Sequence, residues 1–278
     1  MMPAGSRAQR LLRALALIAL GVVLATAVGA LGKKKPLQPA KPQPSPAISI
    51  RATGVGVPEI GEQGTIAISD LASALRSYHD GGQYASDLSA VDSQAQSFML
   101  RQAKALRQAK KRKCKSGKNK KKGRAAARCA PPKLAIVLDI DDTSLSNYAQ
   151  LEANNFTSAT GALIAGATST NQPAIAPTLD LYRQARAAGI SVFAITGRPS
   201  LVQSLTMQNL ANAGYTDLRG VYFKPGGEAT IPFKSGERAA IEQQGYRIVA
   251  NVGDQESDLA GGHADRSFKL PNPFYFIS

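Results

Sequence analysis

The chain has 278 residues, 44% of them hydrophobic, and a formal net charge of +15 at neutral pH. This length accommodates one catalytic domain with extensions, and the apolar content is sufficient for a sizeable core. Residues 101–133 carry fifteen Lys and Arg and no Asp or Glu, so 19 basic and 19 acidic residues remain elsewhere. The basicity belongs to one segment, which argues against a protein whose whole surface binds nucleic acid.

The first 32 residues have the pattern of an export signal. Arg7, Arg10 and Arg13 precede an uncharged apolar run of 19 residues at 14–32, and small residues close that run. This order is typical of a secretory signal peptide, although the run is also just long enough to span a bilayer. We therefore predict a signal peptide or membrane anchor at 1–32, with cleavage favoured, and an extracytoplasmic protein. A buried core helix is disfavoured, because cations flank the run on both sides.

Residues 33–64 are predicted to be a Pro-rich linker, because five prolines within 36–46 prevent a helix or a central strand. The chain has two cysteines, Cys114 and Cys129. In an exported protein such a pair favours a disulfide, and two free thiols remain the alternative.

Two helices are predicted in residues 65–109. Leu71, Leu75 and Tyr78 recur at helical spacing, and a second helix is expected from Tyr84 past Leu106. The low-complexity basic run at 110–131 is predicted to be an exposed loop, because like charges at helical spacing repel one another.

From residue 132 onward, short apolar runs alternate with helical patterns. This alternation predicts a parallel α/β sheet with a site at the carboxyl ends of its strands. Strands are expected at 134–138, 190–195, 221–223 and 247–252, and helices at 178–188, 199–214 and 235–244.

Acidic residues follow the first predicted strand directly. Asp139, Asp141 and Asp142 lie within four residues and would repel one another unless a cation were bound. Hard carboxylate oxygens suit Mg²⁺. For a single acidic triplet, the ordinary interpretation as loop caps would be favoured over a metal site.

The other strand ends carry complementary chemistry. Thr196 and Gly197 follow the second strand, where Pro199 suits the first position of a helix, and amides at a helix N-terminus can bind an anion. Lys234 precedes the helix predicted at 235–244, and an acidic stretch at 254–258 follows the last strand. Together these groups are the ones that metal-assisted phosphoryl transfer requires.

The stretches LDIDDTSLSN, ITGRP, FKSGER and NVGDQESDL resemble the four ordered motifs of the haloacid dehalogenase superfamily. The acid phosphatase branch, with bacterial class C enzymes and plant vegetative storage proteins, is most similar, and RSFKLPNPFYFIS is also like that branch. The resemblance covers about 69–278. It implies a Rossmann-like parallel sheet flanked by helices at 132–278, a small cap at about 144–177 and an N-terminal helical extension.

The resemblance also implies roles at matching positions. Asp139 would be the nucleophile that forms an aspartyl phosphate. Asp141 would protonate the leaving alcohol and then activate water. Thr196 and Gly197 would hold the phosphoryl oxygens, and Lys234 would neutralise developing charge.

For the metal, the resemblance implies ligation of Mg²⁺ by the Asp139 carboxylate, the Asp141 backbone carbonyl and Asp254. Asp258 would hold the outer shell of the metal or the lysine, although it could instead cap the last helix. Asp142 stands where the branch often has Glu.

The leading hypothesis is thus an exported Mg²⁺-dependent acid phosphatase for small phosphomonoesters, of which nucleoside monophosphates are one candidate class. The alternative is a polyanion-binding surface protein acting through 101–133, whose partner would be an anionic surface or polymer. Specific nucleic-acid recognition is not expected, because that segment has no interleaved aromatics. Membrane attachment is expected only if the N-terminal segment is not cleaved.

Overall fold

The computed structural model describes residues 68–116 and 133–277. The predicted signal or anchor, the linker and most of the basic run lie outside these ranges, as does Cys129; the side chain of Cys114 is not described either. Within the described ranges, no helix combines the length and apolar character needed to cross a membrane.

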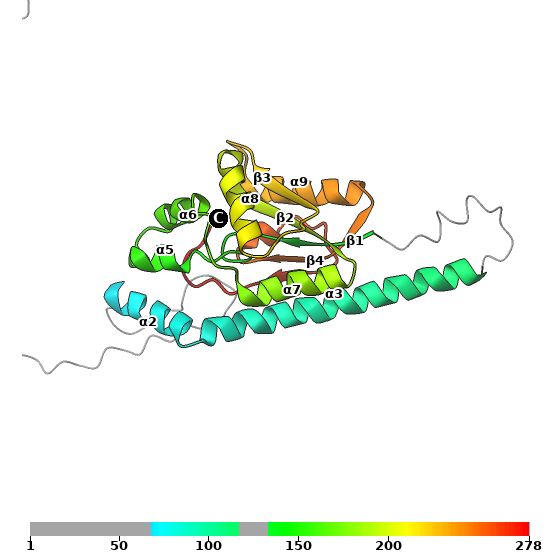
Figure 1. The fold of residues 1–278 in the computed structure, drawn as a ribbon, viewed down its shortest axis with the longest axis horizontal. Coiled ribbons are helices and arrows are strands. Elements are labelled where there is room, and N and C mark those ends of the chain that lie inside the picture. Colours follow the sequence, from blue (N-terminus) through cyan, green and yellow to red (C-terminus); the bar gives the residue numbers. More distant parts are fainter. Residues whose placement is uncertain (1–67, 117–132, 278) are drawn as a thin grey trace, which may run out of the picture. The chain divides into compact units, whose positions relative to one another are not determined.

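Five parallel strands form the sheet, in the order β3-β2-β1-β4-β5. Their bounds are β1 Lys133–Leu138, β2 Ser191–Pro199, β3 Gly220–Lys224, β4 Tyr246–Gly253 and β5 Ser267–Lys269. The chain enters in the middle, builds outward through β2 and β3, and then returns to the other side of β1 (Figure 1). The strand order therefore reverses between β1 and β4, which is where open α/β sheets bind ligands.

Helices cover both faces of the sheet. The alternate β1 residues Leu134, Ile136 and Leu138 join a large core cluster with residues of α3 (Gln83–Ser116) and α7 (Ala176–Ala187). The intervening Ala135 and Val137 join a second cluster with residues of α9 (Thr230–Gln243). Both faces of β1 are thus buried, which explains why this strand is a continuous apolar run in the sequence.

Both predicted N-terminal helices are present, as α2 (Ile68–Asp80) and α3. α3 runs to Ser116, well into the basic segment that we predicted to be a loop. Lys and Arg are good helix formers and are favoured at a helix C-terminus, so repulsion among the like charges of the basic segment does not end the helix at 109. Beyond Ala103, no α3 residue as far as Arg112 is buried.

Two short helices, α5 (Tyr148–Ala153) and α6 (Ala159–Ala167), lie between β1 and β2 in the chain. The hydroxyl of Ser158 caps α6 by accepting a hydrogen bond from the Gly161 amide. Figure 1 shows both helices beyond the carboxyl ends of β1 and β2.

Three details of the prediction were wrong. Pro199 ends β2 in an extended conformation, followed by a 3-10 turn at Ser200–Val202 and then α8 at Gln203–Asn212; the fixed φ of proline suits a strand end equally well. Lys234 lies inside α9 and not before it, because the helix begins earlier, at Thr230. The proline two residues after Thr230 does not prevent this, since proline is tolerated in the first turn of a helix. The three-residue β5 was missed, since so short a strand has no periodic signal.

Candidate active site

Lys234 lies between two buried carboxylates at the carboxyl edge of the sheet. Asp139 follows β1 directly, and Asp258 lies in the short helix α10 (Glu256–Leu259) after β4. The Lys234 Nζ donates to Asp139 Oδ1 over 2.5 Å and to Asp258 Oδ1 over 2.6 Å. Three sequence-predicted residues from three separate elements therefore meet at one point.

The charges of this trio depend on one another. Burial by itself would lower the pKa of Lys234, but the carboxylates of Asp139 and Asp258 raise it above its ordinary value, so the ammonium persists. Burial and then the charge of Asp258 raise the pKa of Asp139, and Lys234 offsets this only in part. A further cation would therefore stabilise ionised Asp139.

Asp254 completes a group that fits a divalent cation. One carboxylate oxygen from each of Asp139, Asp254 and Asp258 lies within 4.8 Å of the others, and all three residues are buried. Burial and then the charges of Asp258 and Asp142 raise the pKa of Asp254 to about 7. An all-oxygen, mutually repelling set of this kind suits a hard divalent metal.

Asp258 reaches this group because Gly253 leaves room for it. A Cβ at Gly253 would lie 2.4 Å from the Cβ of Asp258. The second carboxylate oxygen of Asp258 accepts the Gln255 amide over 2.8 Å, so both of its oxygens are occupied. Asp258 does take part in the helix capping that we considered, and it holds the lysine as well.

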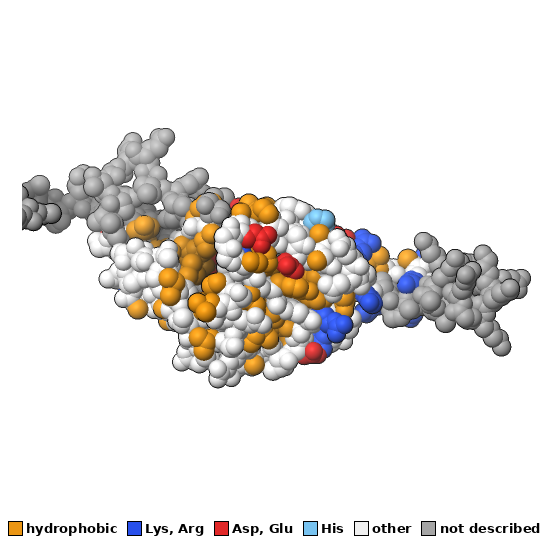
Figure 2. All heavy atoms as spheres, turned by 90° about the horizontal axis from the view of Figure 1, so that it is seen from above, with side chains coloured by type: hydrophobic (Ala, Val, Ile, Leu, Met, Phe, Trp, Pro, Cys, Tyr) orange, Lys and Arg blue, Asp and Glu red, His pale blue; other side chains and the backbone are white. Residues whose placement is uncertain are grey.

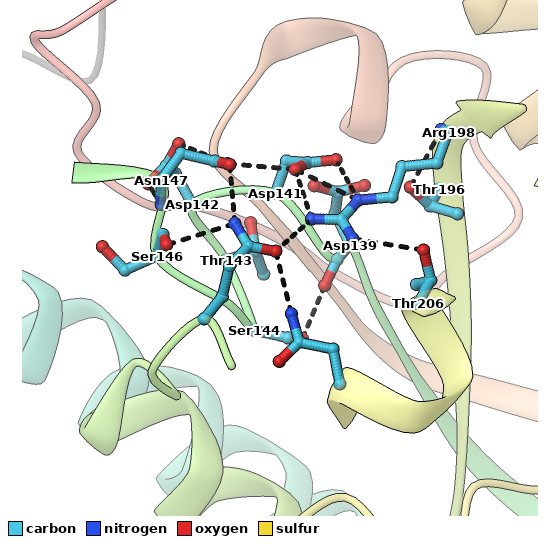
Figure 3. Close-up of polar contacts among 12 residues, drawn as sticks. Asp139, Asp141, Asp142, Thr143, Ser144, Ser146, Asn147, Thr196, Arg198 and Thr206 are labelled. Carbon is cyan, nitrogen blue, oxygen red and sulfur yellow. Dashed lines mark hydrogen bonds and ion pairs between the residues drawn. The ribbon is translucent and has the colours of Figure 1, made fainter. Parts of the chain in front are cut away.

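The Asp141 carboxylate lies apart from the acidic group and pairs with Arg198 (Figure 3). The Arg198 Nε and Nη2 contact both Asp141 oxygens at distances between 2.8 and 3.2 Å. The other contacts of the guanidinium are Gln172 Oε1 at 2.8 Å and Thr206 Oγ1 at 3.2 Å. The Arg198 side chain is only 2% exposed, so these hydrogen bonds and the surrounding protein hold the guanidinium in one orientation.

Thr196 and Gly197 lie beside this pair, at the end of β2. The Thr196 hydroxyl oxygen accepts the Arg198 amide over 3.1 Å, which leaves its O–H to donate elsewhere. The pairing with β3 shifts register between Thr196 and Pro199, so a bulge replaces the helix N-terminus that we expected to bind the anion. Bulges often re-aim groups beside active sites. A Cβ at Gly197 would meet nothing within 4 Å.

Asp142 points away from the acidic group and holds the loop after β1. Its oxygens accept the Asn147 amide at 2.9 Å, the Asn147 Nδ2 at 3.1 Å and the Tyr275 hydroxyl at 2.8 Å. Burial raises the pKa of Asp142 to about 6, and these donors lower it in part. Its φ of +47° lies in the left-handed region, where Asp is better tolerated than most residues.

A family model described as HAD superfamily, subfamily IIIB (Acid phosphatase) matches residues 62–278. The chain belongs to this family. Among curated acid phosphatase relatives, acid phosphatase 1 of Solanum lycopersicum is 42% identical over 109 residues, covering 38% of this chain and 43% of that protein. Vegetative storage protein 1 of Arabidopsis thaliana is 34% identical over 147 residues, covering 51% and 54%. The chain thus spans about half the length of these relatives.

Among solved structures, the class C acid phosphatase from Bacillus anthracis is similar, with a TM-score of 0.50 and 17% identity. The match covers 76% of this chain and 87% of that one. It shows that this acid phosphatase family member has the α/β fold expected from its sequence.

Several residues around this site were not predicted. Arg198 lies within ITGRP, and we predicted no role for it, although its place directly after Thr196 and Gly197 was a usable signal. Arg238 lies within FKSGER, and we predicted no role for it; it is buried, and its guanidinium donates to the carbonyls of Asp258, Ala260 and Gly262. Asn147 and Asn272 lie within the stretches LDIDDTSLSN and RSFKLPNPFYFIS but were given no role, and no local pattern in the sequence pointed to Gln172.

Proposed function

We propose that the protein is a Mg²⁺-dependent phosphohydrolase that cleaves phosphomonoesters through a phospho-aspartate at Asp139. The observation that carries this proposal is the bridge of Lys234 between Asp139 and Asp258, beside a third buried carboxylate. It supports the proposal because Asp139 as nucleophile, Lys234 as fixed cation and a metal-binding set of carboxylates would act together at the sheet edge where such folds bind ligands.

In the first step, an oxygen of Asp139 attacks phosphorus. Lys234 binds Oδ1, so Oδ2 is the oxygen with a free approach. The new Oδ2–P bond forms as the ester P–O bond breaks, and Asp141 gives its proton to the departing alcohol. Thr196 donates its O–H to a phosphoryl oxygen, and the Gly197 amide is proposed as a second donor.

In the second step, Asp141 takes a proton from water and the water oxygen bonds to phosphorus as the Oδ2–P bond breaks, which releases phosphate and regenerates the Asp139 carboxylate. Asp139, Asp254 and the backbone carbonyl of Asp141 are proposed to hold Mg²⁺, with Asp258 in support. When bound, the ion supplies positive charge opposite the phosphoryl oxygens.

We propose that the leaving group is uncharged, as in a nucleoside monophosphate. Gln172, which accepts from Arg198, and Asn209, which donates to Gln172, belong to two stretches, 153–179 and 199–216, that contain no charged residue. The two stretches meet where Asn209 Nδ2 donates to Gln172 Oε1 over 3.0 Å, and Gln172 Oε1 also accepts from the guanidinium of Arg198. Uncharged residues therefore lie next to Arg198. Figure 2 shows a hollow on this face bordered by hydrophobic and other uncharged side chains. A second charged group on the substrate would find no partner there.

We also propose that the protein acts outside the cytoplasm, on the basis of the export pattern at 1–32. Attachment to a membrane would require that segment to be retained. The chemistry above uses no residue of the basic segment 101–133.

The test is hydrolysis of p-nitrophenyl phosphate by the full chain with Mg²⁺ or EDTA, beside Asp139→Asn. Activity should require metal and disappear in Asp139→Asn, but should persist in Asp217→Asn, a matched surface variant in which the carboxylate is 64% exposed. Activity retained by Asp139→Asn would overturn the mechanism, and metal-independent hydrolysis would overturn the role of Mg²⁺.

A further inference from the structure

The segment 270–277 returns to the acidic group after β5. β5 is parallel to β4, so the chain leaves it at the same carboxyl edge as Asp139 and Asp254. The Leu270 amide first donates to the Gly253 carbonyl over 2.8 Å, directly beside Asp254. Asn272, two residues later, is 2% exposed.

Two side-chain amides bind the same oxygen of Asp254. Asn272 Nδ2 and Gln255 Nε2 each donate to Asp254 Oδ2 over 2.6 Å. The other oxygen, Oδ1, accepts only a longer bond of 3.2 Å from the Thr143 hydroxyl. Because two short bonds occupy Oδ2, Oδ1 is the oxygen of Asp254 that is best placed to bind a cation.

Backbone donors of the same segment set the direction of both amides. The Phe274 amide donates to Asn272 Oδ1 over 2.9 Å, and the Ile277 amide donates to Gln255 Oε1 over 2.9 Å. Rotation of either side-chain amide by a half turn would set N–H against N–H and oxygen against oxygen. The backbone at 274 and 277 therefore keeps both NH₂ groups directed at Asp254.

We infer that residues 272–277 form a clasp that positions Asp254 for metal binding, with Asn272 and Gln255 as positioning residues. The clasp holds Oδ2 and presents Oδ1 to the ion. The Tyr275 hydroxyl donates to Asp142 over 2.8 Å and so connects the same segment to the loop after β1. One short segment therefore contacts Asp142 after β1 and Asp254 after β4. The inference rests on the metal group of the proposed function, and it adds Asn272, which lies outside the four motifs, and a role for Gln255 of the fourth motif.

The test is calorimetric Mg²⁺ binding to the full chain, compared with Asn272→Ala. Outer-shell hydrogen bonds to ligands typically contribute 10- to 100-fold to metal affinity, and we expect a loss of this size. Activity at saturating Mg²⁺ should recover, because the variant keeps every ligand and catalytic group. Asn212→Ala is the matched control, since Asn212 Nδ2 also donates to an oxygen, the Thr170 carbonyl, but at an exposed site; its Mg²⁺ affinity should equal that of the wild type.

A second variant guards against misfolding of Asn272→Ala. Ile277→Pro removes the N–H that directs Gln255, at a residue that is 37% exposed, and should weaken Mg²⁺ binding by roughly threefold to tenfold. If the wild type binds Mg²⁺ and both folded variants bind it equally well, the clasp is wrong and the proposed function stands. If the wild type itself binds no Mg²⁺, the proposed metal site fails, and the clasp fails with it.

Discussion

Replacement of Arg198 by Met should separate substrates by their leaving groups. Arg198 contacts both oxygens of Asp141, and its side chain is 2% exposed against 18% for Asp141. Without the guanidinium, Asp141 keeps the hydrogen bond from Asn147 Nδ2 to its Oδ1 over 3.0 Å, but its other oxygen loses its Arg198 contact, so the carboxyl can rotate and hydrate. A displacement of about 1 Å in such a group can cost on the order of 100-fold in rate. Alkyl leaving groups need a proton from Asp141, whereas p-nitrophenolate departs without one.

We therefore expect kcat/KM for an alkyl phosphate to fall by roughly 100-fold, and kcat/KM for p-nitrophenyl phosphate to fall by less than about tenfold. Steady-state assays of both substrates at saturating Mg²⁺ measure this directly. Arg198→Lys keeps the charge but loses the bidentate geometry, so it should fall between the wild type and Arg198→Met.

The matched control is Arg247→Met, which removes a surface arginine that also contacts both oxygens of its partner, Asp265. It should leave both kcat/KM values unchanged. Thermal denaturation of each variant separates altered catalysis from altered folding, because loss of one partner of a buried ion pair can cost about 3–5 kcal/mol of stability. Equal losses on the two substrates in a folded Arg198→Met protein would refute the positioning of Asp141 by Arg198.

Three further predictions concern stability. Burial raises the pKa of the Asp92 carboxyl from 3.8 to about 7, so the folded protein binds the carboxyl proton more tightly than the unfolded chain and loses stability as pH rises from 3.8 to about 7. Asp92→Asn should remove up to ~4 kcal/mol of the difference in unfolding free energy between pH 4 and pH 8, measured by urea denaturation. An unchanged pH dependence in this variant would contradict the prediction. Arg238→Met leaves three carbonyls without their donor and should lower the free energy of unfolding by roughly 3 kcal/mol or more, whereas a loss below about 1 kcal/mol would mean that water replaces the guanidinium. Gly166→Ala should lower both melting temperature and activity, because its Cβ would lie 2.0 Å from the Asn147 Oδ1; a gain in melting temperature would show that helix propensity outweighs the clash.

The sequence by itself determined four of the five strands and the edge of the sheet at which the acidic residues lie. The apolar run ending at Leu138 identified β1, because a strand buried on both faces must be apolar throughout. Asp139 and Asp254 could be assigned to one edge because each directly follows a strand, and parallel strands bring their carboxyl ends together. Lys234 was assigned by motif order, and the structure places it against Asp139 although its helix begins earlier than predicted.

Only the tertiary structure decided which side chains face one another. Arg198 and Asp141 are 57 residues apart, and Asn272 and Asp254 are 18 apart with a strand between them. Such pairs depend on strand order, on a bulge at the end of β2 and on the return of the segment after β5. These features arise from packing across the sheet, and no local periodicity or propensity encodes them, because each partner taken alone has the pattern of an ordinary polar loop residue.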